Sequence, residues 1–433
     1  NETIQNQYTE GTEGLSRKGR ALPRMPNFPR CPLVSDNSLW YNPNRTYFRI
    51  CPSAQMPQEE YTMEKSKVYY TSFRTTLDCN ILQKLRKLIT KAGMTRMDLD
   101  GKFTAVKIHF GEPGNMAYLR PGYVKVVVDM LKEMGARPFL TDCNTLYVGK
   151  RRNALDHLDA AYENGFNPFQ TGCHVIIADG LDGSDDVAVP IDGEYCKEAY
   201  IGRAAVDAEA IISVSHFKGH EGAGFGGALK NLGMGLGSCA GKRHMHHEGK
   251  PQVTPDMCVG CGMCIRQCAH NAIRFEGEGR ERKAVINHDL CLGCGRCVGA
   301  CRNHGAITGP DSRTDMLVRK ISEYAMAAVK DKPHFHISLV MDVSPFCDCY
   351  GTNDVPIIPD VGMFASFDPV ALDLACADAC NKMQRCEHTY LTEQGNHTDD
   401  IFHDTHPVTN WRAGIEHAQK IGLGSMDYEL IEV

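Results

Sequence analysis

The stretch AIISVSHFKGHEGAGFGGALKNLGMG, residues 210–235, decides the fold of this chain. Its first six residues are largely apolar and β-branched, which predicts a short buried strand. Glycines crowd the positions that follow, and the chain then enters a helical segment. A strand that leads through a glycine-rich turn into a helix is half of a βαβ unit, so this stretch predicts a parallel sheet with crossover helices.

The same alternation of strand and helix extends to both sides of this stretch. Further strands are predicted over 67–73, 103–110, 137–141, 173–178 and 335–343, and helices over 77–92, 121–134, 154–164, 313–330, 369–381 and 410–421. We therefore expect an α/β fold with a mostly parallel sheet flanked by helices. Ligands bind such sheets at the carboxyl ends of the strands, so we expect the site in the loops after Phe110, Thr141 and Ser215.

Composition excludes several classes of protein. The 433 residues are 42% hydrophobic and 23% charged, with a net charge of −6, which is typical of a globular chain without attraction to polyanions. No apolar run reaches the roughly 18 residues of a membrane-spanning helix. We expect no nucleic-acid partner and no membrane span. Because the 20 cysteines occur in a long chain without a secretory leader pattern, we predict a reducing cytoplasm.

The chain divides into four parts. Residues 1–62 hold seven of the 21 prolines and lack helical or strand periodicity, which indicates an irregular extension. Residues 63–250 and 311–433 carry the α/β pattern. Residues 251–310 interrupt it with a cysteine-rich segment, so we predict a small module inserted into one α/β domain.

The inserted segment contains two matching cysteine runs. Each has the spacing C-x2-C-x2-C-x3-C, and the second begins 33 residues after the first. This duplicated spacing is that of a bacterial two-cluster ferredoxin, in which the fourth cysteine of each run binds the other cluster. The prediction is two [4Fe-4S] clusters, one held by Cys258, Cys261, Cys264 and Cys301 and the other by Cys291, Cys294, Cys297 and Cys268. The alternative is zinc in two four-cysteine sites.

The glycine-rich turn is the predicted binding site of the α/β part. Gly224, Gly226 and Gly227 would let the backbone approach a ligand, and free N–H groups at the start of the next helix would favour an anion such as phosphate or carboxylate. Lys218 and Lys230 would add positive charge. The alternative is a flexible surface loop or tight helix packing.

Proton chemistry at this site would come from residues with titratable side chains. We predict His220 as the main catalytic group, together with Lys218 and Lys230, and we expect His109 or Glu112 to assist from the end of a neighbouring strand. Cys347 and Cys349 form a C-x-C pair that could bind a soft metal, with buried structural cysteine as the alternative.

Several segments together resemble the iron-sulfur proteins of the domain-of-unknown-function family numbered 362. Besides the twin cysteine runs, they are KIHFGEPGN (107–115), FLTDCNTLYVG (139–149), SHFKGHEGAGFGGALKNLGMG (215–235), DVSPFCDCYGTND (342–354) and VGMFASFDPVALD (361–373). The resemblance covers most of residues 63–433. It implies a soluble bacterial or archaeal iron-sulfur protein, often from anaerobes, whose reaction is not settled.

A remoter resemblance concerns the segment from His220 to Lys230. It is similar to the histidine-to-lysine segment of nickel-pincer lactate racemases, where the lysine holds the pincer cofactor covalently. The resemblance implies that Lys230 anchors a cofactor and that His220 is catalytic or lies near a metal.

These observations favour an iron-sulfur oxidoreductase whose clusters relay electrons to a substrate or cofactor in the α/β cleft. Its partners would be a redox protein or a small molecule. Two alternatives stay open: an electron carrier without catalysis, and a racemase-like enzyme with structural or sensing clusters.

Overall fold

One large sheet carries the α/β part of the molecule. The computed structural model describes residues 65–246, 250–301, 304–309 and 313–433, so the predicted extension over 1–62 lies outside the described residues. Within the described residues, eight strands form this sheet in the order β16-β1-β15-β14-β7-β2-β3-β4. Their bounds are β1 Ser66–Thr71, β2 Phe103–Lys107, β3 Arg137–Asp142, β4 Val175–Ile177, β7 Ala210–His216, β14 His334–Val340, β15 Gly362–Ser366 and β16 Tyr428–Glu432.

Strand directions agree with a mostly parallel sheet. β14, β7, β2, β3 and β4 are parallel neighbours, and β16 pairs parallel with β1. β15 runs antiparallel to both of its neighbours, β1 and β14. β15 and β16 were absent from the predicted elements.

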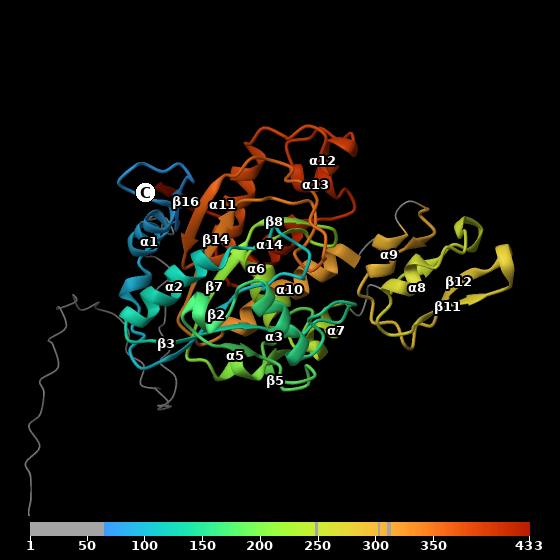
Figure 1. Cartoon of the computed structure of the whole chain (residues 1–433), viewed down its shortest axis with the longest axis horizontal. Helices are drawn as coiled ribbons and strands as arrows, with labels where there is room; N and C mark the ends of the chain where they lie inside the picture. The colour runs from blue at the N-terminus through green and yellow to red at the C-terminus, as the bar shows by residue number, and fades with distance from the viewer. Residues whose placement is uncertain (1–64, 247–249, 302–303, 310–312) are drawn as a thin grey trace, which may run out of the picture. The chain divides into compact units, whose positions relative to one another are not determined.

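Helices cover both faces of the sheet (Figure 1). Successive strand residues point to opposite faces, so Ala105 and Ile211 join one core while Val106 and Ile212 join the other. The first core packs under α6, α10, α11 and α14, and the second under α1, α2 and α3. The helix bounds are α1 Ile81–Ala92, α2 Pro121–Glu133, α3 Ala154–Glu163, α6 Ala228–Leu236, α7 Cys239–His246, α10 Arg313–Val329, α11 Pro369–Asn381 and α14 Trp411–Lys420.

Local sequence signals fix where these helices begin. Asn80 caps α1 in a capping box with Gln83. Asp368 is the N-cap of α11, and its Oδ1 accepts hydrogen bonds from the N–H groups of Val370 and Ala371. Pro369 occupies the first helical position, where its missing N–H costs nothing.

The cysteine segment forms a small unit between α7 and α10. β10 (Gln252–Val253) pairs with β13 (Ile307–Thr308) and so joins the two ends of the segment. Between them lie α8 (Met263–Gln267), the hairpin of β11 (Ile273–Glu276) with β12 (Lys283–Ile286), and α9 (Arg296–Ala300). Cys264 and Cys297 pack with Ile273 and Ile307 in a core of its own.

In the part of the chain that the structure describes, no helix is both long enough and apolar enough to span a bilayer.

Candidate functional site

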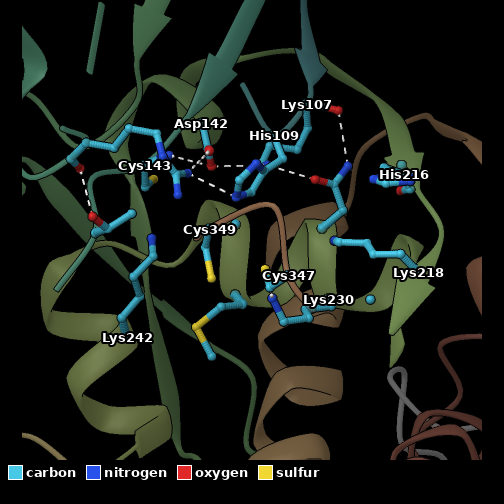
Figure 2. Close-up of a pocket in the computed structure, with 18 of the residues that line it drawn as sticks. Lys107, His109, Asp142, Cys143, His216, Lys218, Lys230, Lys242, Cys347 and Cys349 are labelled. Carbon is cyan, nitrogen blue, oxygen red and sulfur yellow. Dashed lines mark hydrogen bonds and ion pairs between the residues drawn. The ribbon is translucent and has the colours of Figure 1, made fainter. Parts of the chain in front are cut away.

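The carboxyl ends of four neighbouring strands enclose a pocket. β2, β3, β7 and β14 lie side by side in the sheet and are parallel. His109, Asp142, Lys218 and Cys347 follow or end these strands and line the pocket, which contains about 540 Å³ of empty space, part of it open to solvent. Figure 2 shows these side chains converging on one space. Two of the three loops in which the site was expected, those after Thr141 and Ser215, line this pocket. The expected loop after Phe110 does not, since Lys107 and His109 before it do so instead, and the loop after β14 adds Cys347 and Cys349.

Positive charge dominates the lining of this first pocket. Five basic side chains line it, those of Lys107, Arg151, Lys218, Lys230 and Lys242. Three of the five have a carboxylate partner: Lys107 lies 3.1 Å from Asp142, Arg151 lies 2.9 Å from Glu112, and Lys218 lies 3.7 Å from Asp348. Within the described ranges, Lys230 and Lys242 form no ion pair with a carboxylate.

His109 and Glu112, both predicted catalytic groups, contact Arg151. His109 Nε2 lies 3.0 Å from Arg151 Nη1, and burial together with this guanidinium holds the His109 pKa well below its usual value. The ring therefore stays neutral at neutral pH. Glu112 accepts from Arg151 Nε and from the Lys150 N–H, and it lies outside the pocket lining. Glu112 thus positions Arg151, and of the two predicted groups His109 alone faces the pocket.

Lys218 belongs to a buried charge cluster beneath the glycine-rich turn. His216 Nδ1 lies 2.8 Å from Asp348 Oδ2, and its Nε2 lies 2.7 Å from the Met341 carbonyl. Burial opposes ionisation of Asp348, but His216 and Lys218 bring its pKa below the usual value. The carboxylate therefore keeps its charge and holds Lys218 at the pocket wall.

Cys347 and Cys349 meet at the bottom of this pocket. Cys349 holds the pKa of Cys347 well below its usual value, and Cys347 raises the pKa of Cys349. Lys230 Nζ lies 3.7 Å from Cys347 Sγ, and both Lys230 and Lys218 lower the Cys347 pKa further. Figure 2 shows Cys347 beside Lys230. The pair is thus a thiolate at Cys347 next to a thiol at Cys349.

His220 faces a second pocket that adjoins the first. This pocket contains about 620 Å³ of empty space, and Tyr147, Lys230, Met234, Lys242 and Cys349 line both pockets. His220 Nδ1 accepts the N–H groups of Gly222 and Ala223, each at 3.0 Å. Its other nitrogen is thereby left to carry the proton, and His220 adds to the lowering of the Cys347 pKa.

Glu221 and Tyr350 line the second pocket beside His220. The Tyr350 hydroxyl donates to Glu221 Oε1 at 2.9 Å. Glu221 Oε2 is buried and has no hydrogen-bond partner in the part of the chain that the structure describes. This oxygen is therefore available to a ligand or a proton.

The glycines of the turn have three different roles. A Cβ at Gly226 would lie 2.9 Å from Lys218 Nζ, so its absence makes room for that cation. Gly224 has a φ of +78° and packs against Trp411, away from the first pocket. Gly227 leaves space for the carboxylate of Asp373, which would lie 2.3 Å from a Cβ there.

The prediction that the N-terminus of α6 binds an anion is wrong. Asp373 of α11 accepts the first N–H groups of α6, from Ala228 at 2.6 Å and Leu229 at 2.9 Å. A carboxylate of the chain itself therefore satisfies the groups that were expected to bind a ligand. The anion-attracting character of the pocket comes from its lysines instead.

Arg296 joins the cysteine segment to this site. Its guanidinium carbon lies 4.1 Å from the ring centre of Tyr147 and 3.9 Å from that of Tyr350, and Nη2 donates to the Cys349 carbonyl at 2.8 Å. Cys294, two residues before Arg296, lines the second pocket. A predicted cluster ligand thus shares a pocket with His220, Lys230 and the C-x-C pair.

The backbone of both cysteine runs turns in the same way. Gly260, Gly262, Gly293 and Gly295 occupy equivalent positions in the two runs and have φ values of +68°, +76°, +73° and +76°. Such conformations favour glycine. Backbone N–H groups approach three of the sulfurs at 3.4 Å: Ala284 to Cys258, Ala272 to Cys268, and Gly293 to Cys291.

The electrostatic neighbours of Cys264 and Cys294 differ, whereas those of Cys297 are Cys294, Cys291 and Cys268 together with Cys264. Burial raises the pKa of Cys264, and the neighbouring thiols that raise it further are Cys301, Cys258 and Cys261. Burial likewise raises the pKa of Cys294, with Cys291 and Cys268 adding to the rise. Within the described ranges, no three His, Cys, Asp or Glu side chains lie close enough to hold a single metal ion.

Sequence reasoning missed several residues of the site. Lys107, Arg151 and Lys242 stand far apart in the chain, and a basic residue at a strand end is a weak signal alone. Glu221 directly follows His220, and Arg296 lies between Cys294 and Cys297. Their positions next to predicted site residues were the available clue.

Comparisons with known proteins agree on a family and leave the reaction open. The family model described as "Domain of unknown function (DUF362)" matches residues 104–378. No curated protein matches the chain.

Two solved structures are similar to the chain at low identity. The lactate racemase apoprotein from Thermoanaerobacterium thermosaccharolyticum has 10% identity and a TM-score of 0.32, with 64% of this chain and 51% of that chain covered. A protein from Thermotoga maritima has 12% identity and a TM-score of 0.33, with 69% and 57% covered. The chain thus spans only about half the length of these two proteins.

Proposed function

The chain belongs to the family described as Domain of unknown function (DUF362), and we propose that it is an iron-sulfur oxidoreductase acting on a small anionic substrate. Two [4Fe-4S] clusters in the cysteine segment would supply or accept single electrons. The substrate or a second cofactor would occupy the first pocket.

One observation carries this proposal. Cys294 lines the same pocket as Lys230, His220 and Cys349, so a predicted cluster ligand faces the basic site. Arg296 fixes this arrangement through its contacts with Tyr147, Tyr350 and the Cys349 carbonyl. A carrier without catalysis needs no enclosed pocket lined by histidine and lysine, so the pocket favours an enzyme.

The neighbours of two cysteines support the proposal of two clusters. The thiols that surround Cys264 are the ligand set predicted for the first cluster, and those that surround Cys294 belong to the set predicted for the second. Crowded thiols with raised pKa values need a positively charged group before they can ionise together. N–H groups that point at cysteine sulfurs are the usual support of cluster ligands.

The pocket fits a small anion. Lys230 and Lys242 form no ion pair with a carboxylate within the described ranges, and Lys218 adds a third cation. Charge-assisted hydrogen bonds from such groups bind carboxylate or phosphate oxygens strongly. His220 lines the adjoining second pocket, which shares Lys230 and Lys242 with the first, so it would exchange a proton with a substrate that extends into that pocket.

Elemental analysis of anaerobically purified protein tests the proposal. We expect about eight irons and eight acid-labile sulfides per chain, and a paramagnetic signal after reduction with dithionite. Cys294→Ser should lose about half of the iron, whereas Cys79→Ser, outside the cysteine segment, should keep all of it. Zinc in place of iron, or iron without sulfide, would overturn the redox function.

The racemase-like role of Lys230 remains a prediction with its own test. Mass spectrometry of the peptide that contains Lys230 would reveal a covalent adduct if this lysine anchors a cofactor. An unmodified Lys230 peptide from active protein would contradict the prediction that Lys230 binds a cofactor covalently. Lys230 would then act only as a cation beside Cys347.

A further inference from the structure

The loop that carries Cys347 and Cys349 is held firmly in place. Backbone carbonyls along it accept hydrogen bonds from several different parts of the chain. These bonds are Gly219 N–H to Ser344, His406 Nε2 with Pro345, Glu112 N–H to Asp348, and Arg296 Nη2 to Cys349. The two sulfurs therefore keep a fixed relation to the pocket.

Alternation along this loop places both sulfurs on one side. Cys347 and Cys349 line the first pocket, while Asp348 between them points to His216 and Lys218. Each side chain also shifts the pKa of the other, that of Cys347 downward and that of Cys349 upward. Two thiols that line one pocket wall two residues apart, with the intervening side chain turned away, are placed for a disulfide to form between them.

We propose that Cys347 and Cys349 form a reversible disulfide that acts as a two-electron relay between the cysteine segment and the substrate pocket. The inference rests on the proposed function, because the clusters are the electron partners that it names. The pair is thus a redox site inside the pocket and not a metal site.

The chemistry balances with the groups present. On oxidation, the Cys347 thiolate and the Cys349 thiol form one S–S bond and release two electrons and one proton. The two sets of four cysteines predicted as ligands would hold two [4Fe-4S] clusters, and each cluster would accept one electron, so that two clusters would match one disulfide. The proton released from Cys349 leaves toward the second pocket, which Glu221 and Cys349 both line. Burial opposes ionisation of Glu221, but His220 brings its pKa below the usual value, so this carboxylate passes the proton on and does not keep it.

The surroundings favour the reduced form of the pair. Lys230 and Lys218 stabilise the Cys347 thiolate, and His220 adds to this effect. A stabilised thiolate makes the disulfide a stronger oxidant, because reduction then produces a more stable product. We therefore expect a higher reduction potential than that of an unperturbed dithiol, and Lys230→Met should lower it. A tenfold change in the equilibrium constant corresponds to about 30 mV.

Counting electrons is the test. Anaerobic protein with its clusters in place is oxidised mildly and then titrated with dithionite while absorbance reports the clusters. Wild type should take up about four electrons per chain, and Cys349→Ser and Cys347→Ser about two each. Cys79→Ser is the matched control and should still take about four.

Mass spectrometry of alkylated peptides gives the second readout. After mild oxidation the peptide with Cys347 and Cys349 should resist alkylation and be about 2 Da lighter than the dithiol, and reduction should restore two alkylated thiols. Retained cluster signals in both serine variants report that they fold.

The outcomes separate the two proposals. If wild type and Cys349→Ser both take up about two electrons and both thiols stay alkylatable, the relay is wrong and the clusters stand. If wild type takes about two electrons and Cys349→Ser none, the disulfide stands and the cluster function fails. Thiols that are protected by a bound metal ion without the loss of 2 Da would also overturn the relay.

Discussion

The ammonium nitrogen of Lys230 lies 3.7 Å from the sulfur of Cys347, although the two residues are 117 positions apart. Lys230 comes from the first turn of α6, and Cys347 from the loop after β14. The Cys347 pKa lies well below its usual value because Cys349, Lys230, Lys218 and His220 all favour the thiolate against the cost of burial. This contact therefore makes the reactivity of Cys347 depend on the charge of one lysine.

Removing that charge should make Cys347 less reactive. In Lys230→Met the Cys347 pKa should rise toward its usual value, because an opposite charge next to the thiolate is lost. We expect the rate of alkylation by iodoacetamide at pH 7 to fall by roughly an order of magnitude, since the thiolate is the reacting form. The rate is measured against pH by mass spectrometry of the Cys347 peptide.

Two variants separate charge from shape in this experiment. Lys230→Arg keeps the positive charge and should retain most of the wild-type rate at pH 7. Lys242→Met removes a charge from the same pocket but not from beside Cys347, and it should change the rate little. An equal loss of rate in both methionine variants would contradict the specific role of Lys230.

Lys242 should instead contribute to anion binding. Its ammonium group donates to the Gly237 carbonyl and has no carboxylate partner among the described residues, so it can pair with a ligand. We expect Lys242→Met to weaken the binding of a small dianion such as malonate or phosphate by about tenfold, the usual effect of one charge-assisted hydrogen bond. Calorimetry at low and high salt measures this.

The control for this prediction is a lysine on the surface. Lys125→Met changes the net charge equally on the outer side of α2, where Lys125 pairs with Asp129. Binding should be unaffected by it, since exposed charges far from the site are screened by salt. Equal weakening in the two variants would indicate a general field effect and not a contact.

Most of the central fold could be predicted from periodicity. The predicted helix over 369–381 agrees with α11 at both ends, and the strand over 210–215 is one residue shorter than β7. β15 was missed because Gly362–Ser366 is a short segment of five residues directly before the start of α11 at Asp368 and Pro369. Its antiparallel direction depends on the neighbouring strands, which no local pattern encodes.

The site could be predicted in kind but not in detail. Loops at the carboxyl ends of strands follow from topology, and these loops do meet at one pocket. The anion site at the start of α6 was wrong because Asp373 stands 143 positions after Lys230 in the sequence yet caps this helix in space. The partners of Cys347 are long-range contacts of the same sort.

Arg296 should control how firmly the cysteine segment is attached. It stacks between Tyr147 and Tyr350 and donates to the Cys349 carbonyl. Arg296→Ala removes all three contacts, and we expect it to lower local stability by about 2–4 kcal/mol, from two cation–π contacts and one hydrogen bond. Hydrogen exchange of residues 250–301 should speed up accordingly.

Lysine at the same position is the matched comparison. Arg296→Lys keeps the charge but loses the planar group that stacks between two rings, so it should recover only part of the protection. Cys349 should also become easier to alkylate in both variants, because its carbonyl anchor is lost or weakened. Unchanged exchange in Arg296→Ala would contradict the role of this clamp.

Asp373 should make the stability of the α/β part depend on pH. Burial raises its pKa to about 7, although two backbone N–H groups oppose the rise. An aspartate with a folded pKa above its unfolded value of about 3.9 holds its proton more tightly in the folded protein. Its stabilising effect is thus complete below pH 4 and is lost as the pH rises to about 7. Between pH 5 and pH 8 the loss should reach about 3 kcal/mol.

Urea unfolding at pH 5 and pH 8 measures this dependence on Asp373. Asp373→Asn cannot ionise, so the difference in unfolding free energy between the two pH values should shrink by about 3 kcal/mol relative to wild type. The amide should also cost about 1 kcal/mol at pH 5, because its NH₂ group cannot accept the N–H that the second carboxylate oxygen binds. Asp378→Asn on the same helix is the control and should keep the wild-type difference. If Asp373→Asn loses stability with pH as wild type does, another buried group is responsible, and the start of α6 next to Lys230 is insensitive to pH in this range.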